Sequence, residues 1–132
     1  MAADFTVIID VRHHFGDDEG YFGNVPFAGQ NKPFQFNCPG IDASEWSVLL
    51  FQTRDVDHEQ NHFTVNDQKI FGGIPVSSQK EDWNGNVALI NPGWLRERGN
   101  TLHVGSRNSE GSLLGESDDF LIDNVVLFYK TP

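Results

Sequence analysis

The stretch Asp118-Asp119-Phe120-Leu121-Ile122-Asp123-Asn124-Val125-Val126-Leu127-Phe128-Tyr129 decides the fold. It is almost continuously apolar, which predicts a strand that closes the chain against the core. Asp123 interrupts this run, and a carboxylate among apolar side chains needs a cation, backbone N–H groups or a basic partner to compensate its charge. The segment therefore predicts a strand and, within it, a charged group that requires a partner.

Outward from this stretch, the dominant periodicity is two rather than 3.6. Alternating or fully apolar runs at 5–11, 34–37, 47–53, 63–66, 87–90 and 101–104 predict, with the closing segment, about eight short strands separated by Gly, Pro, Asn and Asp turns. The run 47–53 is apolar on both faces and predicts a central strand. Ile41–Glu45 and Gly93–Glu97 are predicted to make one helical turn each. The pattern indicates an all-β, single-domain antiparallel sandwich over residues 1–132.

Composition excludes several classes of function. The 132 residues carry a formal net charge of -10, which disfavours binding to phosphate backbones and to anionic membranes but is compatible with neutral polar ligands and cations. Cys38 is the single cysteine, so no intrachain disulfide can form. The N-terminus does not resemble a signal peptide and no apolar run is long enough to span a membrane. We therefore expect a soluble protein that is cytoplasmic or exported by a non-classical route.

Three motifs, in order, are similar to those of the galactose-binding-domain-like jelly roll, the sandwich of many carbohydrate-binding modules. They are Phe63–Asp67 followed by Ile70–Gly72, Pro92–Leu95 with Gly99–Val104, and Asp119–Leu127. Asp67 stands where the family usually has Gly, and Asp still tolerates a turn with positive φ. The N-terminal half carries no matching motif. The resemblance implies a jelly-roll fold and carbohydrate binding.

The same resemblance implies that Asp123 binds a structural calcium ion. Calcium takes six to eight oxygen ligands, and Asp17 and Asp18, which follow the first predicted strand, are candidates to supply further ones. The alternative is that Asp123 accepts hydrogen bonds from backbone N–H groups or from an Arg.

Trp83, Asn84 and Asn86 are the leading candidates for sugar recognition. Sugar binding requires a flat apolar surface for the C–H side of the ring together with amides and carboxylates for the hydroxyl groups. Trp83-Asn84-Gly85-Asn86 supplies both in a predicted tight turn. The alternative is that Trp83 caps the core at the end of a strand.

Two polar loops supply the other candidate ligand-binding residues. The loop Asp55–Asn61 lacks the Gly and Glu that a helix–loop–helix calcium site requires. Its acids, Asp55 and Asp57 above all, and Asn61 are candidates to line a ligand mouth, unless the loop is simply solvated. Arg107 and Asn108 lie in the loop Gly105–Ser117, which is predicted to be mobile.

No catalytic motif is present. There is no Gly-x-Ser-x-Gly elbow, no phosphate loop and no evident carboxylate pair, so enzymatic activity is not expected. The sequence predicts a lectin-like, non-catalytic carbohydrate-binding module, with calcium as the implied cofactor and homo-oligomers as a route to avidity. A structural or assembly subunit with protein partners is the main alternative, and a small hydrolase is the lesser one. Exposed aromatic residues in a concave patch favour the lectin, and a broad flat exposed face favours assembly.

Overall fold

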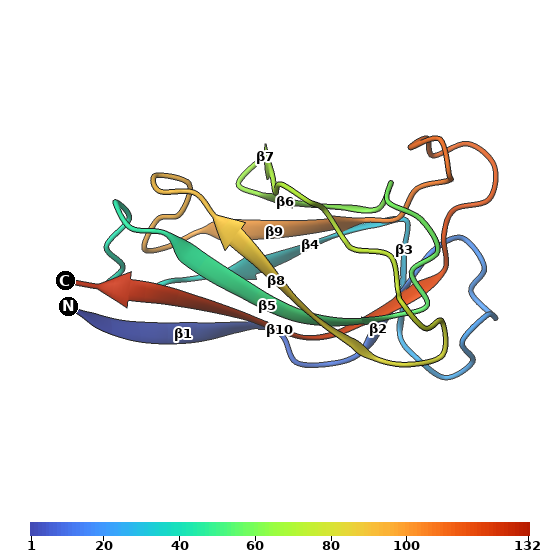
Figure 1. Cartoon of the computed structure of the whole chain (residues 1–132), viewed down its shortest axis with the longest axis horizontal. Helices are drawn as coiled ribbons and strands as arrows, with labels where there is room; N and C mark the ends of the chain where they lie inside the picture. Colours follow the sequence, from blue (N-terminus) through green and yellow to red (C-terminus); the bar gives the residue numbers. More distant parts are fainter.

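The computed structural model describes residues 1–132 as a sandwich of two β-sheets, with both chain ends at the same end of the molecule (Figure 1). Ten strands and no helix make up the structure. In chain order they are β1 (Ala2–Ile9), β2 (His13–Phe15), β3 (Phe27–Gly29), β4 (Asn31–Phe36), β5 (Ser47–Arg54), β6 (His62–Val65), β7 (Gln68–Lys69), β8 (Asn84–Ile90), β9 (Asn100–Gly105) and β10 (Phe120–Thr131).

The strands form one six-stranded and one four-stranded sheet. Sheet A has the order β3-β2-β10-β5-β8, with β1 also paired to β10, and sheet B has the order β4-β9-β6-β7. Every pair is antiparallel except the parallel pair of β2 and β3. The predicted all-β sandwich is confirmed. The predicted central position of β5, between β10 and β8, is also confirmed.

The core lies between the sheets and is rich in aromatic rings. Phe51 of β5 meets Phe63 of β6 edge to face, with ring centroids 4.7 Å apart, so that this contact joins the two sheets. Phe15 stacks on Phe120 with centroids 5.7 Å apart. None of these four side chains is more than 2% exposed. Such offset and edge-to-face pairs are favoured over face-to-face ones, and alternation along the strands places them inside.

A bulge in β10 determines where Asp123 lies. The pairing of β10 with β5 shifts between Asp123 and Val126, and Asn124 has a φ of 49°. Because a bulge adds one residue to a strand, the halves before and after it can both direct apolar side chains to the core. Ile122 and Val125 are accordingly fully buried. Asp123 lies on the outer side of sheet A instead, where its side chain is 14% exposed.

The hairpin between β6 and β7 confirms the turn expected at Asn66-Asp67. Val65 pairs with Gln68, so Asn66 and Asp67 alone make the turn. Their φ angles are 49° and 68°. Positive φ at both central residues is what a two-residue type I′ hairpin requires, and Asn and Asp adopt it more readily than other residues with a side chain.

The sequence pattern misses three short strands, β2, β3 and β7. Strands of two or three residues are too short for a period of two to be recognised. The two predicted helical turns are tight turns rather than helix, since the Glu45 N–H donates to the Asp42 carbonyl at 3.2 Å and the Trp94 N–H donates to the Asn91 carbonyl at 3.3 Å. These are i→i+3 bonds, and no i→i+4 bond follows them.

Candidate functional site

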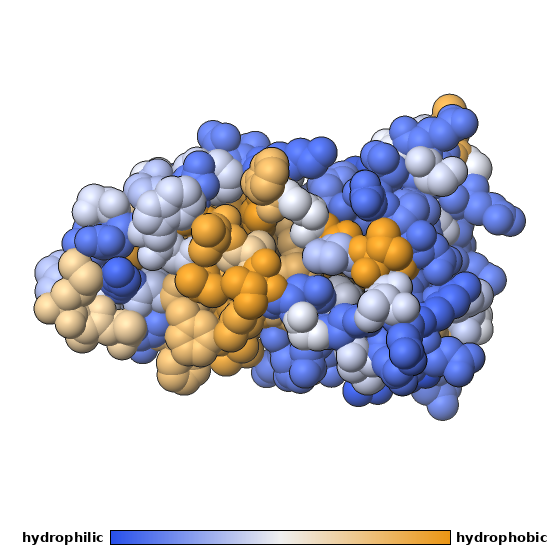
Figure 2. Space-filling model, in the orientation of Figure 1, coloured by the Kyte–Doolittle hydropathy of each residue, from blue (hydrophilic) through white to orange (hydrophobic).

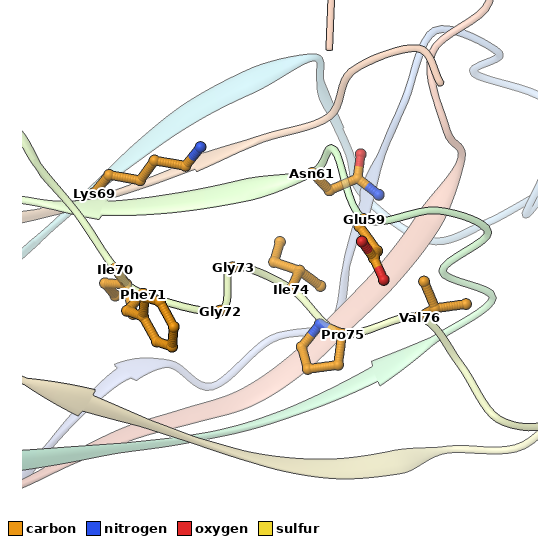
Figure 3. A pocket seen from close by; sticks show the side chains of 10 residues that line it. All are labelled: Glu59, Asn61, Lys69, Ile70, Phe71, Gly72, Gly73, Ile74, Pro75 and Val76. Atoms are coloured by element: carbon orange, nitrogen blue, oxygen red, sulfur yellow. The ribbon is translucent and has the colours of Figure 1, made fainter. Parts of the chain in front are cut away.

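A hollow of about 650 Å³, here called the Phe71 hollow, opens beside the chain that leaves β7 (Figure 3). Its lining residues are Glu59, Asn61, Lys69, Ile70, Phe71, Gly72, Gly73, Ile74, Pro75 and Val76. Its volume lies within the range of small-molecule sites. It combines apolar walls with a few polar groups, the composition that binding sites for small polar ligands use.

A tight turn between two buried anchors holds Phe71 at the rim. Ile70 and Ile74 are each 1% exposed. Between them the Gly73 N–H donates to the Ile70 carbonyl at 3.3 Å, and Gly72 has a φ of 86°. A type II turn needs positive φ at this third position, which glycine adopts without strain. Both anchors are buried in the core, and Phe71 between them is 97% exposed.

Glu59 and Lys69 bring opposite charges to the hollow. Both side chains line it (Figure 3), and neither forms an ion pair within the chain. The Glu59 carboxylate offers hydrogen-bond acceptors and the Lys69 ammonium offers donors. The hollow therefore presents an uncovered aromatic ring beside a free acceptor and a free donor.

Asn61 fixes the loop that carries Glu59. Its side chain is 1% exposed; Nδ2 donates to Asp118 Oδ2 at 2.7 Å and Oδ1 accepts from the Arg107 N–H at 3.0 Å. Asp118 Oδ2 also accepts from the Asp57 N–H at 2.8 Å. Burial raises the pKa of the Asp118 carboxyl, and its Oδ1 has no hydrogen-bond partner. The amide of Asn61 thus ties this loop to the segments on both sides of the 105–117 loop.

The structure corrects the predicted turn at Trp83-Asn84-Gly85-Asn86. Asn84 and Asn86 belong to β8, where Asn84 pairs with Thr53 of β5. Asn86 Nδ2 donates to Thr53 Oγ1 at 3.0 Å, and Asn84 Oδ1 accepts from Ser78 Oγ at 3.1 Å. Because β5 extends to residue 54, it offers ladder partners to residues 84–86, and this pairing overrides the local turn preference. The two amides are engaged within the chain.

Trp83 is covered on one face by Arg12. The guanidinium carbon of Arg12 lies 4.7 Å from the centre of the Trp83 ring, a cation–π contact. Arg12 Nε also lies 3.5 Å from Asp123 Oδ2, and Asp123 Oδ1 accepts from the Asn124 N–H at 2.8 Å. Asp123 therefore has an Arg and a backbone N–H as partners, as the alternative to calcium expects. The Trp83 face under Arg12 is closed to a sugar ring.

Asp17 and Asp18 lie against Asp119 rather than Asp123. The Asp18 N–H donates to Asp119 Oδ1 at 3.2 Å, and this oxygen is 2.7 Å from Nε2 of the fully buried His14. Both residues line an acidic hollow of about 550 Å³ whose other residues are Glu19, Gly20, Tyr21, Glu116, Ser117 and Asp119. No group of three or more His, Cys, Asp or Glu side chains in the chain is arranged to hold a metal ion. The predicted ligand set of Asp123, Asp17 and Asp18 is not brought together.

Asp55 and Asp57 do come together, around Lys80. Lys80 Nζ lies 3.6 Å from Asp55 Oδ1 and 3.5 Å from Asp57 Oδ1. Burial raises the pKa of the Asp55 carboxyl, against the opposing effect of Lys80. The charges of these two carboxylates are already partnered, and neither residue lines the Phe71 hollow.

Arg107 and Asn108 hold their own loop together. The Arg107 guanidinium donates to the Ser106 carbonyl at 2.7 Å, and Asn108 Oδ1 accepts from the N–H groups of Glu110 and Ser112, each at 2.9 Å. None of these bonds reaches Trp83, Asn84 or Asn86. The predicted sugar-binding residues therefore lie in separate local networks.

Sequence reasoning missed Phe71 and Lys69 as site residues, since it placed Ile70-Phe71-Gly72 in a family motif. It predicted that the acids and Asn61 of the 55–61 loop line a ligand mouth, and of these residues Glu59 and Asn61 line the Phe71 hollow whereas Asp55 and Asp57 do not. The sequence Ile70-Phe71-Gly72-Gly73-Ile74 contains a usable signal. The two glycines predict a tight turn, and an aromatic residue in such a turn is expected to be exposed.

Comparison with known proteins gives one similarity. No family model and no curated protein matches the chain. A solved structure titled "Structure of CBM35 from Paenibacillus barcinonensis", a carbohydrate-binding module, is similar with a TM-score of 0.44 and 14% identity over 92% of this chain and 92% of that chain. The sandwich itself is shown by the strand pairing. The chain contains no helix able to cross a membrane.

Proposed function

We propose that this chain is a non-catalytic carbohydrate-binding module that holds a saccharide in the Phe71 hollow. The observation that carries the proposal is the Phe71 ring, 97% exposed on the rim of a hollow that also contains Glu59 and Lys69. The ring offers a flat apolar face to the C–H side of a sugar. The carboxylate and the ammonium offer an acceptor and donors to its hydroxyl groups.

A second aromatic ring extends this surface. Phe71 also lines a neighbouring hollow of about 500 Å³, together with Trp46, Val87, Ala88, Leu89 and Asn91. Trp46 is 50% exposed. A saccharide of more than one unit therefore finds two aromatic side chains in adjoining hollows, and Asn91 as a further polar group.

The hollow favours binding over hydrolysis. Glycoside hydrolases use two carboxyl groups that flank the bond to be cleaved. Glu59 is the one acid among the residues that line the Phe71 hollow. The neighbouring hollow beside Trp46 is lined by no acid. The geometry therefore supplies contacts for a sugar without the second carboxyl that its cleavage requires.

A glycan array followed by calorimetry with the best glycan tests the proposal. We expect Phe71→Ala to weaken binding at least tenfold, because it removes the stacking surface, and Glu59→Gln to weaken it severalfold. Leu114→Ala is the matched control, since Leu114 is 79% exposed but lines neither hollow. A folded protein that binds no glycan, or Phe71→Ala with unchanged affinity, contradicts the proposal.

A further inference from the structure

The outer side of sheet A carries apolar side chains that nothing in the chain covers. Strand register places them in two rows across β1, β10, β5 and β8: Phe5, Phe128, Val48 and Leu89 in the first row, and Val7, Val126, Leu50 and Val87 in the second. We call these eight residues the apolar face. Figure 2 shows apolar side chains gathered over this part of the sheet. Six of the eight are between 36% and 64% exposed.

Each strand contributes one larger and one smaller side chain to the apolar face. The pairs along the strands are Phe5 and Val7 on β1, Phe128 and Val126 on β10, Leu50 and Val48 on β5, and Leu89 and Val87 on β8. Consider a two-fold axis that lies between two facing sheets, perpendicular to the strands and midway between the two rows. Rotation about this axis places each strand of one copy over the same strand of the other copy. Each larger side chain then lies opposite the smaller side chain of that strand. Larger side chains opposite smaller ones let facing layers interdigitate.

No charged side chain on the apolar face opposes a second copy. None of the eight residues is charged, although the chain has a net charge of -10 and two copies repel at long range. Two ion pairs lie beyond the rows, Arg12 with Asp123 at 3.5 Å and Lys130 with Glu45 at 3.8 Å. A second copy therefore meets no unpaired carboxylate among these groups.

The apolar face has the size that a weak but specific dimer needs. The exposed fractions of its side chains correspond to roughly 600 Å² of apolar surface in each copy. Two copies in full contact bury up to about 1,200 Å², the lower end of specific interfaces. The exposed apolar area of one copy lies at the upper end of the range for the largest apolar patch on a monomeric protein, and such patches are often functional.

We propose that the apolar face binds a second copy of this chain, sheet against sheet, about a two-fold axis that brings Phe5 of one copy over Val7 of the other. Two such sheets pack about 10 Å apart with their strands within about 30° of alignment. The apolar face adjoins the proposed saccharide surface, because Val87 and Leu89 also line the hollow beside Trp46. The residues of β1 line neither hollow, so substitutions on β1 test the dimer apart from saccharide binding.

Sedimentation equilibrium over a range of protein concentrations tests the dimer. We expect a monomer–dimer equilibrium for the wild-type chain. Val7→Glu and Phe5→Lys should each raise the dissociation constant at least tenfold, because each buries an unpaired charge. Both positions are on an edge strand and are 49% and 57% exposed, so both variants should fold, which circular dichroism checks. Leu114→Glu, an exposed apolar position outside the apolar face, should leave the equilibrium unchanged.

Mixing the two variants tests the two-fold arrangement. An equimolar mixture of Val7→Glu and Phe5→Lys chains should form dimers again, because the new Glu of one chain lies opposite the new Lys of the other. A mixture that stays monomeric overturns the two-fold pairing. A wild-type chain that is monomeric at all concentrations, or a dimer that both variants leave intact, overturns the proposal, and the face then has another occupant.

Discussion

The outer side of sheet A and the loop end of the sandwich expose their groups in opposite ways. On the apolar face, Phe and Val side chains lie in water with no charge among them. At the loop end, Asp118 and His14 are 6% and 0% exposed, and each has a polar atom without a partner. Folding alone favours neither placement, since apolar surface favours burial and polar atoms favour solvent. Such conflicts are expected where a surface or a loop serves a function.

The loop end depends on specific bonds, whereas the apolar face depends on strand register alone. His14 packs between Phe22 and Phe27, with ring centroids 4.8 Å and 4.9 Å away, and bonds to Asp119. Loss of one partner there leaves a buried polar group unsatisfied. A substitution on the apolar face changes a surface that is already in water. Mutations should therefore affect stability strongly at the loop end and weakly on the apolar face.

The largest effect is expected from Gly16→Ala. A Cβ at position 16 would lie 1.9 Å from Asp119 Oδ1, and Gly16 has a φ of 148°. Asp119 must then move away from His14, and we expect a loss of about 3 kcal/mol in the free energy of unfolding. Urea denaturation measures it. Gly20→Ala is the control, because its Cβ would meet only Asp18 Oδ1, at 3.8 Å. Equal stability of the two variants would show that the contact at Gly16 is unimportant.

Asn61→Ala should have the next largest effect. It removes one of the two donors to Asp118 Oδ2 and leaves the Arg107 N–H without its acceptor. We expect a loss of about 2 kcal/mol and weaker saccharide binding, because the loop that carries Glu59 loses its anchor. Urea denaturation and calorimetry measure the two effects. Asn24→Ala, at an exposed position, is the control; a similar small loss for both variants would contradict the anchoring role.

Asp118→Asn should remove part of the pH dependence of stability. Burial raises the pKa of Asp118 in the folded state, so its contribution is complete below the unfolded pKa and is lost as the pH rises through the folded pKa. The amide does not ionise. We therefore expect the same Tm as wild type near pH 3 and a Tm about 3 °C higher near pH 7. Thermal unfolding at both pH values measures this, with exposed Asp10→Asn as the control. An Asp118→Asn variant that is less stable at pH 7 would show that the charge is needed.

The smallest effect is expected from chelation. Calcium binding by Asp123 remains a prediction from the family resemblance. Because Asp123 is paired with Arg12, we expect EDTA to change the Tm by less than about 1 °C. A clear drop that added calcium reverses, and that Asp123→Asn removes, would show that Asp123 does bind the ion. A drop that Asp119→Asn removes and Asp123→Asn does not would place the ion in the acidic hollow.

Local sequence was sufficient for the elements whose determinants are local. Alternation predicts the long strands, and the both-face apolar run predicts β5 as a central strand. Asn66-Asp67 predicts its hairpin turn because these residues tolerate the positive φ they adopt. For the site, the sequence indicated that acids of the 55–61 loop line a ligand mouth, but it assigned the sugar to Trp83 and its neighbours.

The remaining features depend on which strands lie side by side, and no residue carries that information alone. The bulge at Asn124 turns Asp123 outward to Arg12, and the length of β5 draws Asn84 and Asn86 into β8. The apolar face exists because four strands from distant parts of the chain align their outward side chains. The Phe71 hollow exists because Ile70 and Ile74 find the core. Register and burial are properties of the assembled sheets, since each backbone hydrogen bond in them joins two separate segments.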